Sequence, residues 1–274
     1  MNKKKYTIAQ ILPALNNGGV ERGVVEISKA LVDNNFRSIV ISSGGYMVPQ
    51  IIRNGGIHYE LDVHTKNPLK WSKIRSELKS VLEGENVDLI HFCSRVPAWI
   101  GLPLGAILNI PIITSVHMRF RKSNIFKKYY NSILTKGNFI IAISKHIERS
   151  VKNSFPNVSG KIKVIHRGVD LDLFNPSKIN PARIISQSKH LNLKDNVPVI
   201  IMAARPAMWK GYQVLIKALS KVKHNFQCVF IGAGDGNQKF QNILIKKIIH
   251  SKLETKIKLI GSTRDIQAAM ILGD

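Results

Sequence analysis

The chain has 274 residues, enough for one large domain or two of ordinary size. With 44% hydrophobic and 21% charged residues it has the composition of a globular protein, which excludes a disordered chain. The 41 lysines and arginines against 17 acidic residues give a net charge of +24, which either reflects a basic background or favours an anionic partner such as a nucleotide phosphate or a phospholipid surface.

Apolar runs of strand length alternate with amphipathic stretches of helix length, which predicts an α/β fold with parallel sheets. In the first half, strands are predicted at Thr7–Ile11, Ser38–Ser42, Gly56–Tyr59, Asp88–Phe92, Ile112–Val116 and, as the last of this half, Phe139–Ile143. Helices are predicted from about Val20 to Asn34 and from Ser144 to about Ser154. The uncharged stretch Val96–Val116 could span a bilayer by its length, but its prolines favour a buried helix followed by a strand.

A second α/β series follows a junction. No strong periodicity occurs from Asn175 to Pro198, so we place an N-terminal domain at 1–175 and a C-terminal domain at 190–274. The second series predicts strands at Val199–Ala204, Gln227–Ile231 and Ile257–Ile260 and helices at Gly211–Val222, Phe240–Ser251 and Asp265–Leu272. Two or three strands are too few for a doubly wound sheet, so this domain is expected to be incomplete.

Two loops are candidate ligand sites because ligands bind beyond the carboxyl ends of strands in open α/β sheets. Asn16–Gly19 joins the first strand to its helix, and its glycines would let a backbone approach an anion closely, or they only make a tight turn. Arg205 and Lys210 follow the strand Val199–Ala204, so the guanidinium of one and the ammonium group of the other can contact the same diphosphate, or the two are solvated loop cations. The fingerprint G-x-G-x-x-G of NAD enzymes does not occur.

Several segments resemble family 4 glycosyltransferases, in the family's order. The stretch 205–211 resembles the motif G-R-x-x-x-x-K-G, with Ala204 in place of its first glycine. The segments 17–22, 164–170, 230–234 and 259–265 resemble, in turn, the glycine loop, the interdomain linker and two donor-domain loops of that family.

This resemblance implies a GT-B fold of two Rossmann-like doubly wound parallel sheets, the second one incomplete here. It also implies transfer of a hexose from a nucleotide-diphosphate sugar, GDP- or UDP-linked, with retention and without a metal. Arg205, Lys210 and His117 are the expected catalytic residues. The residues expected to bind the nucleotide sugar are Gly18, Gly19, Gly232, Gly234 and Thr263.

The expected acceptor is a lipopolysaccharide or another cell-envelope glycan or glycolipid, and the variants at 167–170 and 209–211 resemble hexosyltransferases and mannosyltransferases of the lipopolysaccharide core. We therefore expect peripheral attachment to the inner face of the cytoplasmic membrane and no nucleic-acid partner. His91, Arg95 and Lys145 follow other strands, and contact with an acceptor and plain loop structure stay equally open for them. Four other histidines are interpreted as surface or loop residues: His58, His64, His146 and His166.

The family's E-x7-E segment, which handles the donor sugar and the ribose, is expected about twenty residues after Asp265 and does not occur before Asp274. We therefore expect the chain to be truncated in its donor-binding domain and inactive in glycosyl transfer on its own, with the remainder on a second chain. The alternative is a non-catalytic remnant or a module that binds nucleoside diphosphates.

Overall fold

The computed structural model describes residues 5–16, 18–120, 124–236 and 238–274. It divides into two compact units, Met1–Val169 (unit 1) and Asp170–Asp274 (unit 2). The division falls after Val169, ahead of the interval in which the sequence predicts the junction. Asn17, part of the predicted glycine loop, lies outside the described residues.

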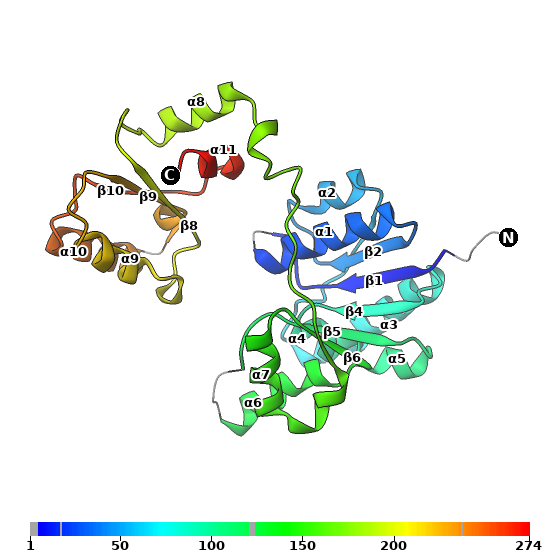
Figure 1. The fold of residues 1–274 in the computed structure, drawn as a ribbon. Coiled ribbons are helices and arrows are strands. Elements are labelled where there is room, and N and C mark those ends of the chain that lie inside the picture. Colours follow the sequence, from blue (N-terminus) through cyan, green and yellow to red (C-terminus); the bar gives the residue numbers. More distant parts are fainter. Residues whose placement is uncertain (1–4, 17, 121–123, 237) are drawn as a thin grey trace. The chain divides into compact units, whose positions relative to one another are not determined.

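Unit 1 is built on a seven-stranded parallel sheet with the order β3-β2-β1-β4-β5-β6-β7 (Figure 1). Its strands are β1 (Thr7–Ile11), β2 (Arg37–Ser42), β3 (Ile57–Glu60), β4 (Leu89–Phe92), β5 (Ile112–Val116), β6 (Phe139–Ala142) and β7 (Ile162–Val164). Its helices are α1 (Gly19–Asp33), α2 (Val48–Arg53), α3 (Trp71–Gly84), α4 (Arg95–Gly101), α5 (Pro103–Ile107), α6 (Ile125–Ser132) and α7 (Lys145–Ser154). Helices α2, α3 and α6 are not among the predicted elements.

The centre of this sheet is buried because its strands are nearly continuous runs of apolar residues. In β2, every residue after Arg37 is buried, and the neighbouring strands pair in register through Ile11, Ile41 and Phe92. Leu78 of α3 is fully buried in the same core. The sheet is therefore a rigid platform whose strands all end at one edge.

One expectation for unit 1 is wrong. The strand at 139–142 is not the last of the sheet, because β7 pairs with it from Ile140↔Ile162 to Ala142↔Val164. The stretch 96–116 is helical and then forms β5, as predicted, but the helical part is two short helices, since α4 ends at Gly101 and Pro103 begins α5. No helix in the described ranges is both long and apolar enough to cross a membrane.

Unit 2 contains a three-stranded parallel sheet with the order β10-β9-β8. Its strands are β8 (Val199–Ala203), β9 (Gln227–Ile231) and β10 (Ile257–Ile260), and its helices are α8 (Pro181–His190), α9 (Tyr212–Leu219), α10 (Gln238–His250) and α11 (Ile266–Ile271). Helix α8 forms where the sequence predicts no periodic element, and it packs on α11. Arg183 and Asp265 hold the two together through a bidentate ion pair, with 2.7 Å from Nε to Oδ2 and from Nη2 to Oδ1.

Both cysteines are buried thiols that lie in apolar stretches of the sequence. Cys93 directly follows β4, and Cys228 lies within β9. Burial raises the pKa of each thiol to about 12. Both therefore stay protonated at neutral pH and are poor nucleophiles.

Candidate functional site

The carboxyl edge of the unit 1 sheet gathers most of the predicted residues of that unit. Gly18 and Gly19 follow β1, His117 follows β5 and Arg167 follows β7. The strand order turns back between β1 and β4, which is the topological switch point where ligands bind in open α/β sheets. The predicted residues of unit 1 therefore lie where the fold places a ligand.

The glycine loop ends at the beginning of α1. Gly18 is the residue before the helix, and its carbonyl accepts a hydrogen bond from the Arg22 N–H at 3.0 Å. A side chain at Gly18 would collide with the Glu21 carboxylate, since a Cβ there would lie 2.2 Å from Oε2. The first-turn amides of α1 can bind an anion, but Glu21 is an acidic side chain in that same turn. An anion at this loop would therefore have to displace or outweigh the Glu21 carboxylate.

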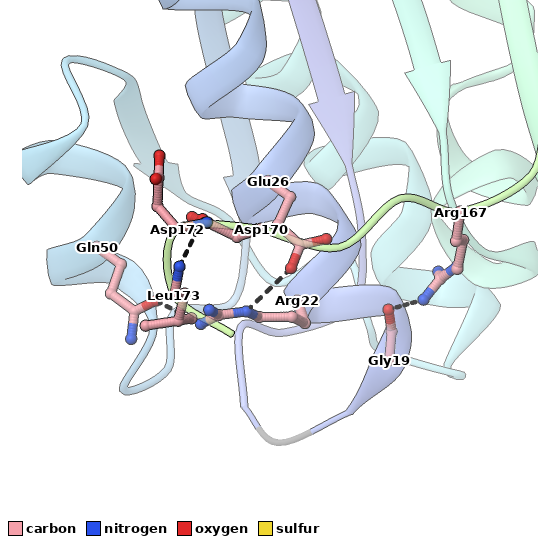
Figure 2. A network of polar contacts seen from close by, with 8 residues as sticks. All are labelled: Gly19, Arg22, Glu26, Gln50, Arg167, Asp170, Asp172 and Leu173. Carbon is pink, nitrogen blue, oxygen red and sulfur yellow. Dashed lines mark hydrogen bonds and ion pairs between the residues drawn. The ribbon is translucent and has the colours of Figure 1, made fainter. Parts of the chain in front are cut away.

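His117 lies within hydrogen-bond reach of Arg167, whose Nη2 is 3.2 Å from its Nδ1. The same guanidinium donates from Nη1 to the Gly19 carbonyl (Figure 2). Burial, Arg167 and His91 lower the pKa of His117 to about 4. The ring is therefore neutral at pH 7. Its Nε2 is buried and has no hydrogen-bond partner in the part of the chain that the structure describes.

His91 is a buried residue of β4, so the interpretation as plain loop structure is wrong, and its contact with an acceptor stays a prediction. Its Nε2 lies 2.6 Å from the Ser115 Oγ, and the Cys93 Sγ lies 3.7 Å from the same nitrogen. Burial lowers the pKa of His91 to about 4, so it is neutral as well. His91 therefore stabilises the contact between β4 and β5 near the carboxyl edge of the sheet.

Arg95 and Lys145 differ in their surroundings. The Arg95 guanidinium lies over the Phe120 ring at 5.9 Å from the centroid, and its Nε is buried without a partner among the described residues. Burial lowers the pKa of Arg95. Lys145 is exposed at the first turn of α7, which Ser144 caps by accepting from the Ile147 N–H at 3.2 Å.

The other four histidines form no cluster with one another. His64, His146 and His166 are exposed, as predicted. His58 is not a surface loop residue: it lies in β3, half-buried, with its Nε2 2.9 Å from the Ser42 Oγ. Among the described residues there is no group of three or more histidine, cysteine or acidic side chains that could hold a metal ion.

In unit 2 the cationic pair lies on the loop that follows β8. Arg205 and Lys210 are both exposed, and neither side chain makes a hydrogen bond or ion pair with the described residues. The loop itself is fixed: the Tyr212 hydroxyl donates to the Ala204 carbonyl, and the Ala204 N–H donates to the Ile231 carbonyl at 3.1 Å. Gly211 ends the loop with a φ of 91°, a left-handed conformation that favours glycine. Two cations without partners are thus held on an anchored loop.

Gly232 and Gly234 allow neighbouring loops to approach each other closely. A Cβ at Gly232, whose φ is 87°, would lie 2.8 Å from the Ala204 carbonyl oxygen. A Cβ at Gly234 would lie 2.7 Å from the Gly261 nitrogen. These glycines therefore bring the loops after β8, β9 and β10 together. The Asp235 carboxylate reinforces this by accepting from the Ser262 N–H at 2.7 Å.

Thr263 lies on the third of these loops and already has two partners. Its hydroxyl is 3.0 Å from the Gln187 Oε1 and accepts from the Asp265 N–H at 3.2 Å. Its contact with a nucleotide stays a prediction, as do the donor contacts of the four glycines. Arg167 lies in the segment 164–170 that resembles the interdomain linker, but the sequence predicts no site role for it. The signal that could have found it is a cation placed just after a strand at this edge.

Comparison with known proteins identifies the chain. The model for Glycosyltransferase Family 4 matches residues 17–173, and the model for glycosyl transferases group 1 matches residues 184–270. A glycosyltransferase from Rickettsia africae, known from its crystal structure, is 35% identical, with 99% of this chain and 72% of that chain covered and a TM-score of 0.86. The chain belongs to glycosyltransferase family 4.

Two further solved structures show that this family 4 chain has the GT-B fold. HepE from Anabaena, crystallised with UDP-glucose, is 20% identical over 98% of this chain and 72% of that chain, with a TM-score of 0.77. WaaG, a glycosyltransferase involved in lipopolysaccharide biosynthesis, is 12% identical over 97% and 72%, with a TM-score of 0.70. The chain spans 64% or less of the length of the curated relatives it matches.

Proposed function

We propose that the protein transfers a hexose from a nucleotide-diphosphate sugar to a glycan or glycolipid of the cell envelope, lipopolysaccharide included, with retention and without a metal. The observation that carries this proposal is the pair Arg205 and Lys210, exposed and without partners on the anchored loop after β8. UDP-glucose in HepE supports a nucleotide-sugar donor, and the role of WaaG supports a lipopolysaccharide acceptor.

The geometry of unit 2 suits a diphosphate leaving group. The planar guanidinium of an arginine and the ammonium group of a lysine can neutralise phosphate oxygens without a bound metal ion. Because the loop that carries both side chains is anchored at the end of a strand, it places two positive charges where negative charge develops. In this proposal Gly232, Gly234 and Thr263 shape the neighbouring loops around the nucleotide.

The test is nucleotide binding by calorimetry, with UDP and GDP titrated separately into the chain. Arg205→Ala should weaken binding by about 10- to 100-fold, because charge-assisted hydrogen bonds contribute about 1.5–3 kcal/mol each. Lys210→Ala should weaken it by a smaller factor, because a lysine offers a point charge and no bidentate fork.

The matched control is Lys246→Ala, since Lys246 is an equally exposed cation on α10 of the same unit. It should bind both nucleotides as the wild type does. Equal binding by wild type and Arg205→Ala would refute the assignment of the diphosphate site.

We also propose that the protein attaches peripherally to the inner face of the cytoplasmic membrane. The net charge of +24 favours anionic lipid. Helix α6 supplies an apolar contact that we call the α6 face: the exposed side chains Ile125, Phe126, Tyr129 and Tyr130. Residues one or four positions apart lie on the same side of a helix, so these four side chains form one face, beside the exposed Lys127.

Flotation with vesicles tests this attachment. Binding should require anionic lipid and should fall as KCl is raised from 0.1 to 1 M, because the Debye length shortens from about 10 to about 3 Å. Phe126→Ala should reduce the bound fraction by about 10-fold, because the variant loses an aromatic side chain that membrane binding would bury. The control is Leu69→Ala, which removes another strongly exposed apolar side chain of unit 1. Binding that ignores both lipid charge and salt would contradict the proposal.

A further inference from the structure

Arg167 connects two parts of the site that lie far apart in the sequence. It follows β7, the edge strand of the unit 1 sheet, yet its side chain reaches the loop after β1 and the end of β5. One donor, Nη1, is bonded to the Gly19 carbonyl, and another, Nη2, lies 3.2 Å from the His117 Nδ1. Figure 2 shows the guanidinium against the first turn of α1.

Helix α1 leaves room for this guanidinium by having no side chains at two positions one turn apart. A Cβ at Gly19 would lie 3.2 Å from Arg167 Nη1, and a Cβ at Gly23 would lie 3.2 Å from Nη2. Both distances are shorter than ordinary van der Waals contact. The pair Gly19 and Gly23 is therefore the surface on which Arg167 docks.

The contact with His117 has a chemical consequence. A guanidinium carries only donors, so the Nδ1 of His117 must accept, and in the neutral ring the proton then resides on Nε2. That Nε2 has no partner among the described residues. An N–H donor without an acceptor at the carboxyl edge of the sheet is suited to a hydroxyl oxygen of a bound sugar.

We propose that Arg167 is a positioning residue that holds His117 as the neutral Nε2–H tautomer and ties it to the Gly19 loop, so that His117 offers a hydrogen-bond donor to the hydroxyl of a sugar bound at this edge of the unit 1 sheet. The tautomer and the tie are properties of the unliganded protein. The role toward the sugar rests on the proposed function.

The experiment is long-range proton–nitrogen NMR on the chain with ¹⁵N-labelled histidine, with the His117 signals assigned by their loss in His117→Gln. In the wild type we expect an unprotonated Nδ1, a protonated Nε2 and titration near pH 4, since burial, Arg167 and His91 all disfavour the charged ring. Arg167→Ala should give a mixture of tautomers and move the titration toward pH 6.5.

Two further variants separate positioning from simple disruption of the fold. Gly23→Ala favours the helix but crowds the docked guanidinium, so it should shift the His117 signals in the same direction as Arg167→Ala. Arg149→Ala removes an exposed arginine of α7 and should leave them unchanged. The signals of the buried His91 report in each variant that the sheet is intact.

An unchanged tautomer and titration of His117 in Arg167→Ala would overturn the positioning role, whatever the nucleotide titrations show. The NMR experiment needs neither nucleotide nor turnover, so its result does not depend on the proposed function. Failure of UDP and GDP to bind would refute the proposed function and leave the tautomer result standing.

Discussion

Replacing Tyr212 with alanine is expected to lower the free energy of unfolding of unit 2 by about 3–5 kcal/mol, the cost of removing a large buried aromatic side chain. Tyr212 is 1% exposed and packs edge-on against Phe230 and Phe240, with ring centroids 5.0 and 5.8 Å away. Its hydroxyl also donates to the Ala204 carbonyl. The substitution therefore opens a cavity in a small core and releases the loop that carries Arg205.

Hydrogen exchange resolved by peptide is the measurement, because it separates the two units. Amides of β8 and β9 should lose protection in Tyr212→Ala, and those of β1 and β4 in unit 1 should keep it. Tyr212→Phe is the matched control, since it keeps the ring and loses one hydrogen bond, a cost of about 1 kcal/mol. Unchanged protection of β8 in Tyr212→Ala would show that this ring does not hold the core of unit 2.

Acidification from pH 6.5 to pH 4 is expected to destabilise unit 1 by about 3 kcal/mol through His91 alone. Burial lowers the pKa of His91 from 6.5 to about 4 in the folded protein. Between these values the unfolded chain binds a proton that the folded chain does not, so stability is full above pH 6.5 and falls as the pH falls. His117 titrates in the same window and adds to the loss, because its pKa is also lowered from 6.5 to about 4 in the folded protein.

Urea denaturation at several pH values between 4 and 7 tests this, with wild type compared to His91→Gln. The variant should be less stable at pH 7, since it disturbs the contact with the Ser115 hydroxyl. It should also show a shallower dependence on pH, because one group that protonates on unfolding has been removed. The difference between the two curves isolates His91 from the other titrating groups. Parallel curves would contradict the assignment.

The carboxyl edge of each sheet could be predicted from the sequence because its signals are local. Strands at 7–11, 112–116, 227–231 and 257–260 form with the predicted bounds, since each is a short, mostly apolar stretch of strand length. Because parallel strands run in the same direction, the loops after these strands can be placed at the carboxyl edge of their sheet. Arg205 and His117 could therefore be placed at strand ends before any contact was known.

The contacts of the site residues could not be predicted in the same way. His91 lies near the end of β4 and His117 follows β5, yet the first is bonded inside the core and the second has a buried nitrogen without a partner among the described residues. Which of the two occurs depends on Ser115 and Arg167, which belong to other strands and loops. Strand β7 is not predicted from the sequence for a similar reason, since a strand of three residues carries too little pattern to be recognised without its neighbour β6.

The sequence by itself determined the α/β class, the order of most strands and helices, the family resemblance and the placement of Arg205 and Lys210 on one loop. These follow from the periodicity of apolar residues and from short motifs, both of which act within a few neighbouring residues. Only the tertiary structure decided that Arg167 joins Gly19 to His117 and that Gly232 and Gly234 allow three loops to meet. Such contacts join segments many residues apart, because packing brings strand ends together at distances that no local pattern encodes.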